Sequence, residues 1–116
     1  MDLTYAVNAA VVALVLAVLG GLKLARAGVM TRQAEHLGYS PTAFALIGLA
    51  ELAGTAGLTV GLWVPPVGVA AATGIVLLLA LATRAHLRSG DPPVRALGAV
   101  WLGAVALVVA VTGVLR

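Results

Sequence analysis

One apolar stretch decides the fold: residues 42–63 read TAFALIGLAELAGTAGLTVGLW and carry a single ionisable side chain, Glu51. A helix that crosses the hydrocarbon core of a bilayer needs about 20 apolar residues. Three further runs meet that length, so the expected spans are residues 3–22, 42–63, 65–83 and 96–115. The sequence therefore predicts an all-α integral membrane protein, a four-helix transmembrane bundle that forms one domain over residues 1–116.

The composition points the same way. Of the 116 residues, 62% are hydrophobic and 9% are charged, whereas a soluble domain carries about 25% charged residues. This excludes the soluble globular class. The chain has no cysteine, which excludes disulfide scaffolds, thiolate zinc sites, iron–sulfur clusters and dithiol relays. No basic segment precedes the first run, and that run is longer than the apolar part of a signal peptide, so we expect a mature membrane helix there.

The basic residues set the expected orientation. Six of the seven lie in residues 23–41 and 84–95, and the net charge is +3. The positive-inside rule predicts that these two loops are cytoplasmic and that both termini face outward in a multi-pass cell-membrane protein. Such scattered charges favour contact with an anionic lipid surface over binding of nucleic acid, so we expect the lipid bilayer as a partner and no nucleic acid.

Local signals mark the helix ends and the packing faces. Ser40 is a plausible N-cap with Pro41 in the first helical position, and the prolines after Val64 separate the second span from the third. A short interfacial helix around residues 31–37 is expected. Small residues recur every four positions in the first span, a pattern that favours close helix packing and leaves a homodimer open.

Glu51 is the informative side chain. An ionised carboxylate near the middle of a span costs a few kcal/mol. At 100° per residue, its face of the helix also carries Gly48, Gly54 and Thr55, which indicates a face turned into the bundle. With Asn8, at a depth suited to meet Glu51, these residues are the candidate ligand-binding set. Glu51 is interpreted either as a polar or proton-transfer group in a cavity, or as a structural hydrogen bond between helices.

Lys23 and His86 complete the candidate catalytic set with Glu51. For Lys23, snorkelling to the interface is favoured over direct contact with Glu51, because contact requires the stem to reach inward by about a turn and a half. His86 is able to act as acid, base or ligand. The only other histidine is His36, in a different loop. Two separated histidines without cysteine are a weak metal pattern, so no intrinsic metal is expected.

Several short segments, in order along the whole chain, resemble the DoxX-like family of small four-span membrane proteins. They include Gly20-Gly21-Leu22-Lys23-Leu24, Gly48-Leu49-Ala50-Glu51-Leu52-Ala53-Gly54 and Ala85-His86. The resemblance maps the lysine, the intramembrane glutamate and the closing histidine of the family pattern onto Lys23, Glu51 and His86. It implies an association with quinone-linked sulfur oxidation and with membrane oxidoreductase complexes, while distant relatives resemble assembly chaperones for other membrane proteins.

Three function hypotheses remain open at this point. The first is a membrane subunit or lipophile-binding module, with a quinone or other lipophile as ligand and an oxidoreductase as partner. The second is an intramembrane isomerase, cyclase or epoxide hydrolase that uses Glu51 as general acid or base on a hydrophobic substrate. The third is a membrane-protein assembly factor in which Glu51 only ties helices together.

Overall fold

The computed structural model describes residues 3–116. They form five helices: α1 (Leu3–Leu24), α2 (Gly28–Leu37), α3 (Pro41–Val60), α4 (Pro65–Arg88) and α5 (Pro93–Leu115). All except α2 are long and apolar enough to cross a membrane. With 20–24 residues each, they are about 30–36 Å long at 1.5 Å per residue, which matches a hydrocarbon core of about 30 Å. The expected all-α transmembrane bundle is confirmed.

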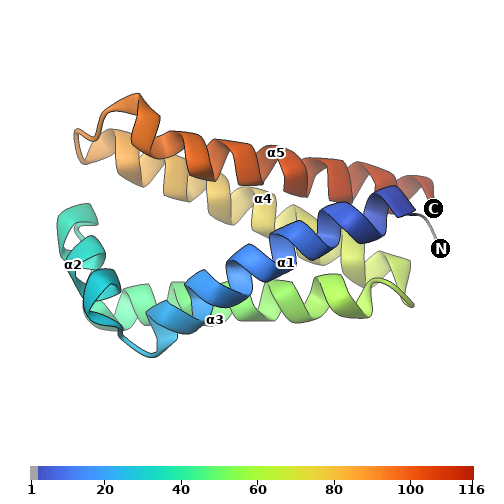
Figure 1. Ribbon diagram of the computed structural model, residues 1–116, viewed down its shortest axis with the longest axis horizontal. Coiled ribbons are helices and arrows are strands. Elements are labelled where there is room, and N and C mark those ends of the chain that lie inside the picture. Colours follow the sequence, from blue (N-terminus) through green and yellow to red (C-terminus); the bar gives the residue numbers. More distant parts are fainter. Residues whose placement is uncertain (1–2) are drawn as a thin grey trace.

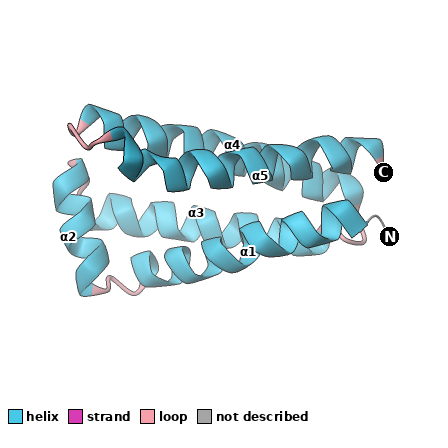
Figure 2. Ribbon diagram, turned by 45° about the horizontal axis from the view of Figure 1, so that its top comes forward, coloured by secondary structure: helices cyan, strands magenta, loops and turns pink. Residues whose placement is uncertain are grey.

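The four long helices form two pairs. α1 packs along α3, α4 packs along α5, and the pairs meet through contacts of α3 with α4 and of α1 with α5. α2 lies across one end of the bundle, close to the α4–α5 loop, while the two chain ends and the α3–α4 turn lie at the other (Figure 1). We call these the α2 end and the Trp63 end. Figure 2 shows the same pairing from a second direction.

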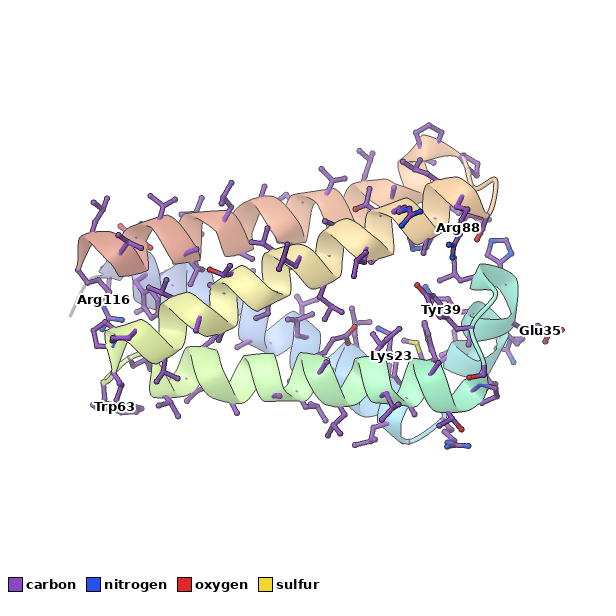
Figure 3. The ribbon with its side chains drawn as sticks, turned by 180° about the vertical axis from the view of Figure 1, so that it is seen from behind. Lys23, Glu35, Tyr39, Trp63, Arg88 and Arg116 are labelled. Carbon is purple, nitrogen blue, oxygen red and sulfur yellow. The ribbon has the colours of Figure 1, made fainter. Side chains whose placement is uncertain are left out.

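Small residues bring α3 and α4 together near the Trp63 end. A Cβ built on Gly61 would collide with the backbone of Gly68 and with the Tyr5 hydroxyl, and one on Gly57 would lie 2.7 Å from the Cβ of Ala71. Such close approach is the usual way in which membrane helices associate, because burial of apolar surface from water gives no driving force in lipid. The two helices are close at this end and diverge toward the α2 end (Figure 3).

Helix ends differ from the expected spans by a few residues. α1 continues to Leu24, α4 continues to Arg88 and α5 begins at Pro93, so helical backbone extends past the apolar runs into polar sequence. α3 ends at Val60, before Trp63. The carbonyls of Gly61 and Leu62 are then free of the helix and accept hydrogen bonds from the Arg116 guanidinium, at 2.5 and 2.9 Å. Hydropathy marks where apolar side chains stop, whereas backbone hydrogen bonding decides where a helix stops.

The N-terminus of α3 has the expected cap. The Ser40 hydroxyl accepts a hydrogen bond from the Ala43 N–H at 3.1 Å, and Pro41 occupies the first helical position. This arrangement satisfies one of the amides that a helix leaves unpaired at its start.

α2 is the interfacial helix expected around residues 31–37, although it begins earlier, at Gly28. Its buried side chains, Met30, Ala34 and Leu37, pack with Phe44 of α3 and Ala85 of α4. It ends at Gly38, whose φ of 84° is a left-handed conformation that glycine adopts without strain. α2 therefore bridges the two diverging helices at this end of the bundle.

Candidate functional site

The site begins where α1 crosses α3. A Cβ on Gly48 would lie 2.7 Å from the Gly20 carbonyl oxygen and 2.7 Å from the Lys23 Cβ, so a larger residue at Gly48 would force the helices apart. One turn after these glycines, α1 carries Lys23 and α3 carries Glu51. Because side chains tilt toward the N-terminus of their own helix, and the two helices run in opposite directions (Figure 1), the two side chains lean toward one another.

Lys23 and Glu51 form a buried ion pair. Lys23 Nζ donates to Glu51 Oε1 at 2.8 Å, and the two side chains are 10% and 7% exposed. Nζ also lies 5.2 Å from the centre of the Phe44 ring, within the range of a cation–π contact. The expectation that Lys23 snorkels to the interface was wrong, because the opposed tilt of the side chains closes an axial gap that residue counting along the helices leaves open.

The second oxygen of the carboxylate has a different environment. Glu51 Oε2 is buried and has no hydrogen-bond partner among the described residues. Buried polar atoms in native proteins almost always have a hydrogen-bond partner, so an unpaired one calls for an explanation. Oε2 is therefore an acceptor available to a donor group that enters the site.

A cavity of about 260 Å³ adjoins the ion pair, between the diverging parts of α3 and α4. Its wall is mostly apolar, formed by leucine and alanine side chains of α4 with Phe44 and Ile47 of α3. The polar side chains among its lining residues are Lys23, Gln33, Tyr39, Glu51 and His86. Figure 3 shows Lys23 and Tyr39 in the space between α3 and α4. All three candidate catalytic residues thus border one cavity.

The candidate ligand-binding residues lie elsewhere. Among the residues that the structure describes, the cavity lining includes none of Asn8, Gly48, Gly54 and Thr55. The Asn8 amide donates to the Thr4 carbonyl at 2.8 Å, in its own helix. The Thr55 hydroxyl donates to the Glu51 carbonyl at 3.1 Å and lies 3.4 Å from that of Ala13.

The two glycines in this set serve helix packing. Gly48 contacts α1 at the crossing with Gly20, and a Cβ on Gly54 would lie 2.9 Å from the Ile75 side chain of α4. Helical periodicity placed these residues on the correct face of α3, but it does not say which residues of that face meet a cavity.

A second polar cluster lies next to the cavity at the α2 end. His86 Nδ1 lies 2.8 Å from Asp91 Oδ2, and His36 Nε2 lies 2.5 Å from Asp91 Oδ1. Hydrogen bonds from His86 and then from His36 hold the pKa of the Asp91 carboxyl below its ordinary value. Asp91 was not among the residues expected in the site. Its position in the sequence could have indicated the contact: Asp91 follows His86 by five residues, in a Gly-Asp-Pro-Pro turn that returns the chain toward the end of the helix.

The site offers hydrogen bonds and charge but no cluster suited to a metal: over residues 3–116, no group of three or more His, Asp or Glu side chains is arranged to hold one. What it can do chemically is bind a small polar head group. The ammonium of Lys23 is a donor, Glu51 Oε2 is an acceptor, and His86 supplies an imidazole held by a carboxylate. A group able both to donate and to accept a hydrogen bond would satisfy this set.

The chain was compared with known proteins. No curated protein and no solved structure matches it. The model of the DoxX-like family matches residues 7–114, a range that includes all or most of each long helix and every polar residue of the cavity. The chain is a member of the DoxX-like family.

Proposed function

We propose that this protein is a membrane subunit that binds the head group of an amphipathic lipophile, a quinone or quinol, in the cavity beside Lys23 and Glu51. The single observation that carries the proposal is the buried Glu51 Oε2 without a partner, next to a cavity with an apolar wall. A quinol hydroxyl would donate to Oε2, and a ring oxygen would accept from the Lys23 ammonium.

The size of the cavity supports a ligand that is only partly enclosed. Its volume of about 260 Å³ lies below the roughly 300–1,000 Å³ of pockets that enclose a drug-sized molecule. The volume suits one substituted ring. Leu81 lines the cavity and is 56% exposed, so an isoprenoid tail would leave along this side and lie among the lipid chains.

Electron transfer would have to come from a partner, since the chain has no cysteine for a thiol relay. We therefore infer an oxidoreductase partner that exchanges electrons with the bound lipophile. Self-association is also part of the proposal: Ala50, Ala53, Ala70 and Gly74 line a shallow surface depression between α3 and α4, and small residues of this kind suit a homodimer contact.

We also infer that the α2 end faces the cytoplasm. Arg88 lies at this end and Arg116 at the Trp63 end (Figure 3). The helix bounds place Arg26, Arg32, Arg84 and Arg95 at the α2 end as well. This asymmetry supports a cytoplasmic α2 end by the positive-inside rule. Fusion of a reporter that is active only outside the cytoplasm to Arg116 should give an active reporter, and an inactive one would reverse the orientation.

The test of ligand binding compares glutamate variants in lipid nanodiscs with decylubiquinol as the probe. Glu51→Leu should weaken binding about tenfold or more, because a charge-assisted hydrogen bond is lost. Glu35→Gln, at an exposed glutamate of α2, is the matched control and should bind like the wild type. Equal affinities for all three proteins, or no saturable binding by the wild type, would reject the proposal.

A second candidate function is an intramembrane acid–base enzyme, and a specific observation favours it. His86 is hydrogen-bonded to Asp91 and borders the same cavity as Glu51, and a carboxylate that orients a histidine is a common arrangement in acid–base catalysis. The substrate would be a hydrophobic molecule that undergoes isomerisation, cyclisation or epoxide opening. Glu51→Gln should then abolish turnover, whereas unchanged turnover would favour the assembly-factor alternative, in which the amide replaces a purely structural hydrogen bond.

A further inference from the structure

Asp91, in the loop between α4 and α5, joins α2 and α4 through its side chain. One carboxylate oxygen contacts His36 of α2 and the other contacts His86 of α4. The Asp91 side chain is 5% exposed, although it belongs to the loop between α4 and α5. We call this cluster of His36, Asp91 and His86 the clasp.

The clasp lies beside the part of the cavity lining at the α2 end, which we call the roof. The roof consists of Gln33 and Leu37 of α2 and of Tyr39 just after it, and His86 lines the cavity from α4. α2 is short and is bounded by two turns with left-handed residues, Arg26 (φ 56°) and Gly38 (φ 84°). A helix of ten residues is marginal by itself, so its position depends on what it contacts.

Two kinds of contact hold this roof. On the α3 side, Met30, Ala34 and Leu37 pack against Phe44. On the α4 side, the buried apolar residue of this cluster is Ala85, a small side chain. The polar contact from His36 to Asp91 adds a restraint on the side where α3 and α4 diverge and the cavity lies.

Water at this roof would change the site beneath it. The Lys23–Glu51 pair is strong where the dielectric constant is low and weak in water, and Oε2 would gain a water partner in place of a ligand. The lipid-facing side is different, because Leu81 is an exposed lining residue there and lipid chains bring no competing hydrogen bonds.

We propose that the clasp seals the cavity against water at the α2 end, so that a ligand exchanges with the bilayer through the side lined by Leu81. The inference rests on the proposed function for its ligand, since a lateral route suits a molecule dissolved in the membrane. The seal itself is a property of the protein without ligand and can be measured separately.

The test uses the absence of native cysteine. Ala82→Cys introduces one thiol in the cavity lining, and the protein is placed in nanodiscs, where both ends meet water. A charged, membrane-impermeant methanethiosulfonate reports access from water, and N-phenylmaleimide reports access from lipid. The two labelling rates are compared in the Ala82→Cys background alone and with His36→Ala, Asp91→Ala or the matched control Glu35→Gln, which changes an exposed neighbour of His36.

His36→Ala should raise the rate with the charged reagent about tenfold, the effect of one lost charge-assisted hydrogen bond on the population of the open state. Asp91→Ala removes the contacts with both histidines and should raise that rate by at least as much. The rate with N-phenylmaleimide should stay unchanged in all four proteins, and Glu35→Gln should match its parent. Should Asp91→Ala fail to fold, His36→Ala carries the test alone, because the His36 side chain is 49% exposed.

Two outcomes overturn the proposal. If the charged reagent labels the parent as fast as the clasp variants, the roof is not a seal. If both reagents accelerate equally, the clasp holds the whole bundle together and has no selective effect on water. Neither outcome depends on a ligand. The labelling test can therefore reject the seal while Glu51→Leu still loses decylubiquinol binding, and the binding test can fail while the labelling rates still support the seal.

Discussion

Replacement of Lys23 by methionine tests how much the buried ion pair contributes to the free energy of unfolding. The variant keeps a long apolar stem but removes the ammonium that donates to Glu51 Oε1 at 2.8 Å and faces the Phe44 ring at 5.2 Å. The remaining carboxylate is 7% exposed and would have neither oxygen paired with a side chain. Breaking a buried pair by removal of one partner costs about 3–5 kcal/mol, so Lys23→Met should lower the free energy of unfolding by about that amount.

The double variant Lys23→Met/Glu51→Leu separates charge from packing. Replacement of both members of a buried pair by apolar residues is often neutral or stabilising, so the double variant should recover most of the stability lost by Lys23→Met. Unfolding in mixed micelles with increasing sodium dodecyl sulfate, followed by helical circular dichroism, gives the four free energies of the cycle. Arg32→Met, at an exposed basic residue of α2, is the matched control and should change stability by less than about 0.5 kcal/mol.

Additive effects of the two substitutions on the free energy of unfolding would refute an interaction between Lys23 and Glu51. If Lys23→Met and Glu51→Leu each cost the same and their effects sum in the double variant, the two side chains do not interact energetically. A cost below about 1 kcal/mol for Lys23→Met would equally contradict a buried pair, because exposed ion pairs fall in that range.

Three further predictions concern packing, a cap and pH. Gly48→Ala should destabilise by about 1–3 kcal/mol in the same unfolding assay, since its Cβ would lie 2.7 Å from the carbonyl oxygen of Gly20; Gly21→Ala, with nothing within 4 Å, should be neutral or stabilising. Ser40→Ala should cost about 1 kcal/mol by loss of the N-cap of α3, and Ser40→Asn should restore it. The pKa of Asp91 is lowered below 3.8 by hydrogen bonds from the histidines of α4 and α2; its contribution to stability is therefore complete above the unfolded-state pKa and is lost as the pH falls through the folded-state value. Between pH 5 and 2, the thermal unfolding temperature should fall less in Asp91→Asn than in the wild type. An equal dependence of that temperature on pH in both proteins would contradict the prediction.

The sequence was sufficient for the number of spans and for the identity of the central carboxylate. Hydrophobic length gives the spans because lipid demands about 20 apolar residues, and Glu51 stands out because a charge in such a run is costly. The end of α3 was predicted less well. The carbonyls just after it accept hydrogen bonds from the Arg116 guanidinium, which lies 54 and 55 residues later in the chain, a contact that no local pattern reveals.

The polar contacts of the site were predicted less well, for a related reason. The pairing of Lys23 with Glu51 needs the Gly20–Gly48 crossing and the opposed tilt of the side chains, neither of which is visible in one helix taken alone. Asn8 has a suitable depth, yet it bonds within its own helix. Depth and helical face restrict which residues can meet, whereas the crossing point of two helices decides which residues do meet.

The arrangement of charges supports the proposal that Glu51 binds a ligand in addition to tying two helices together. A purely structural tie is satisfied best when every polar atom is paired, or when apolar side chains replace the pair altogether. Here one oxygen holds Lys23, and the other is buried without a partner beside a cavity. The unpaired oxygen lies where α3 and α4 diverge, whereas the same helices approach closely at Gly57 and Gly61. The cavity and the unpaired acceptor thus occur together in one part of the bundle, which is the arrangement that the proposed binding of a hydrogen-bond donor needs.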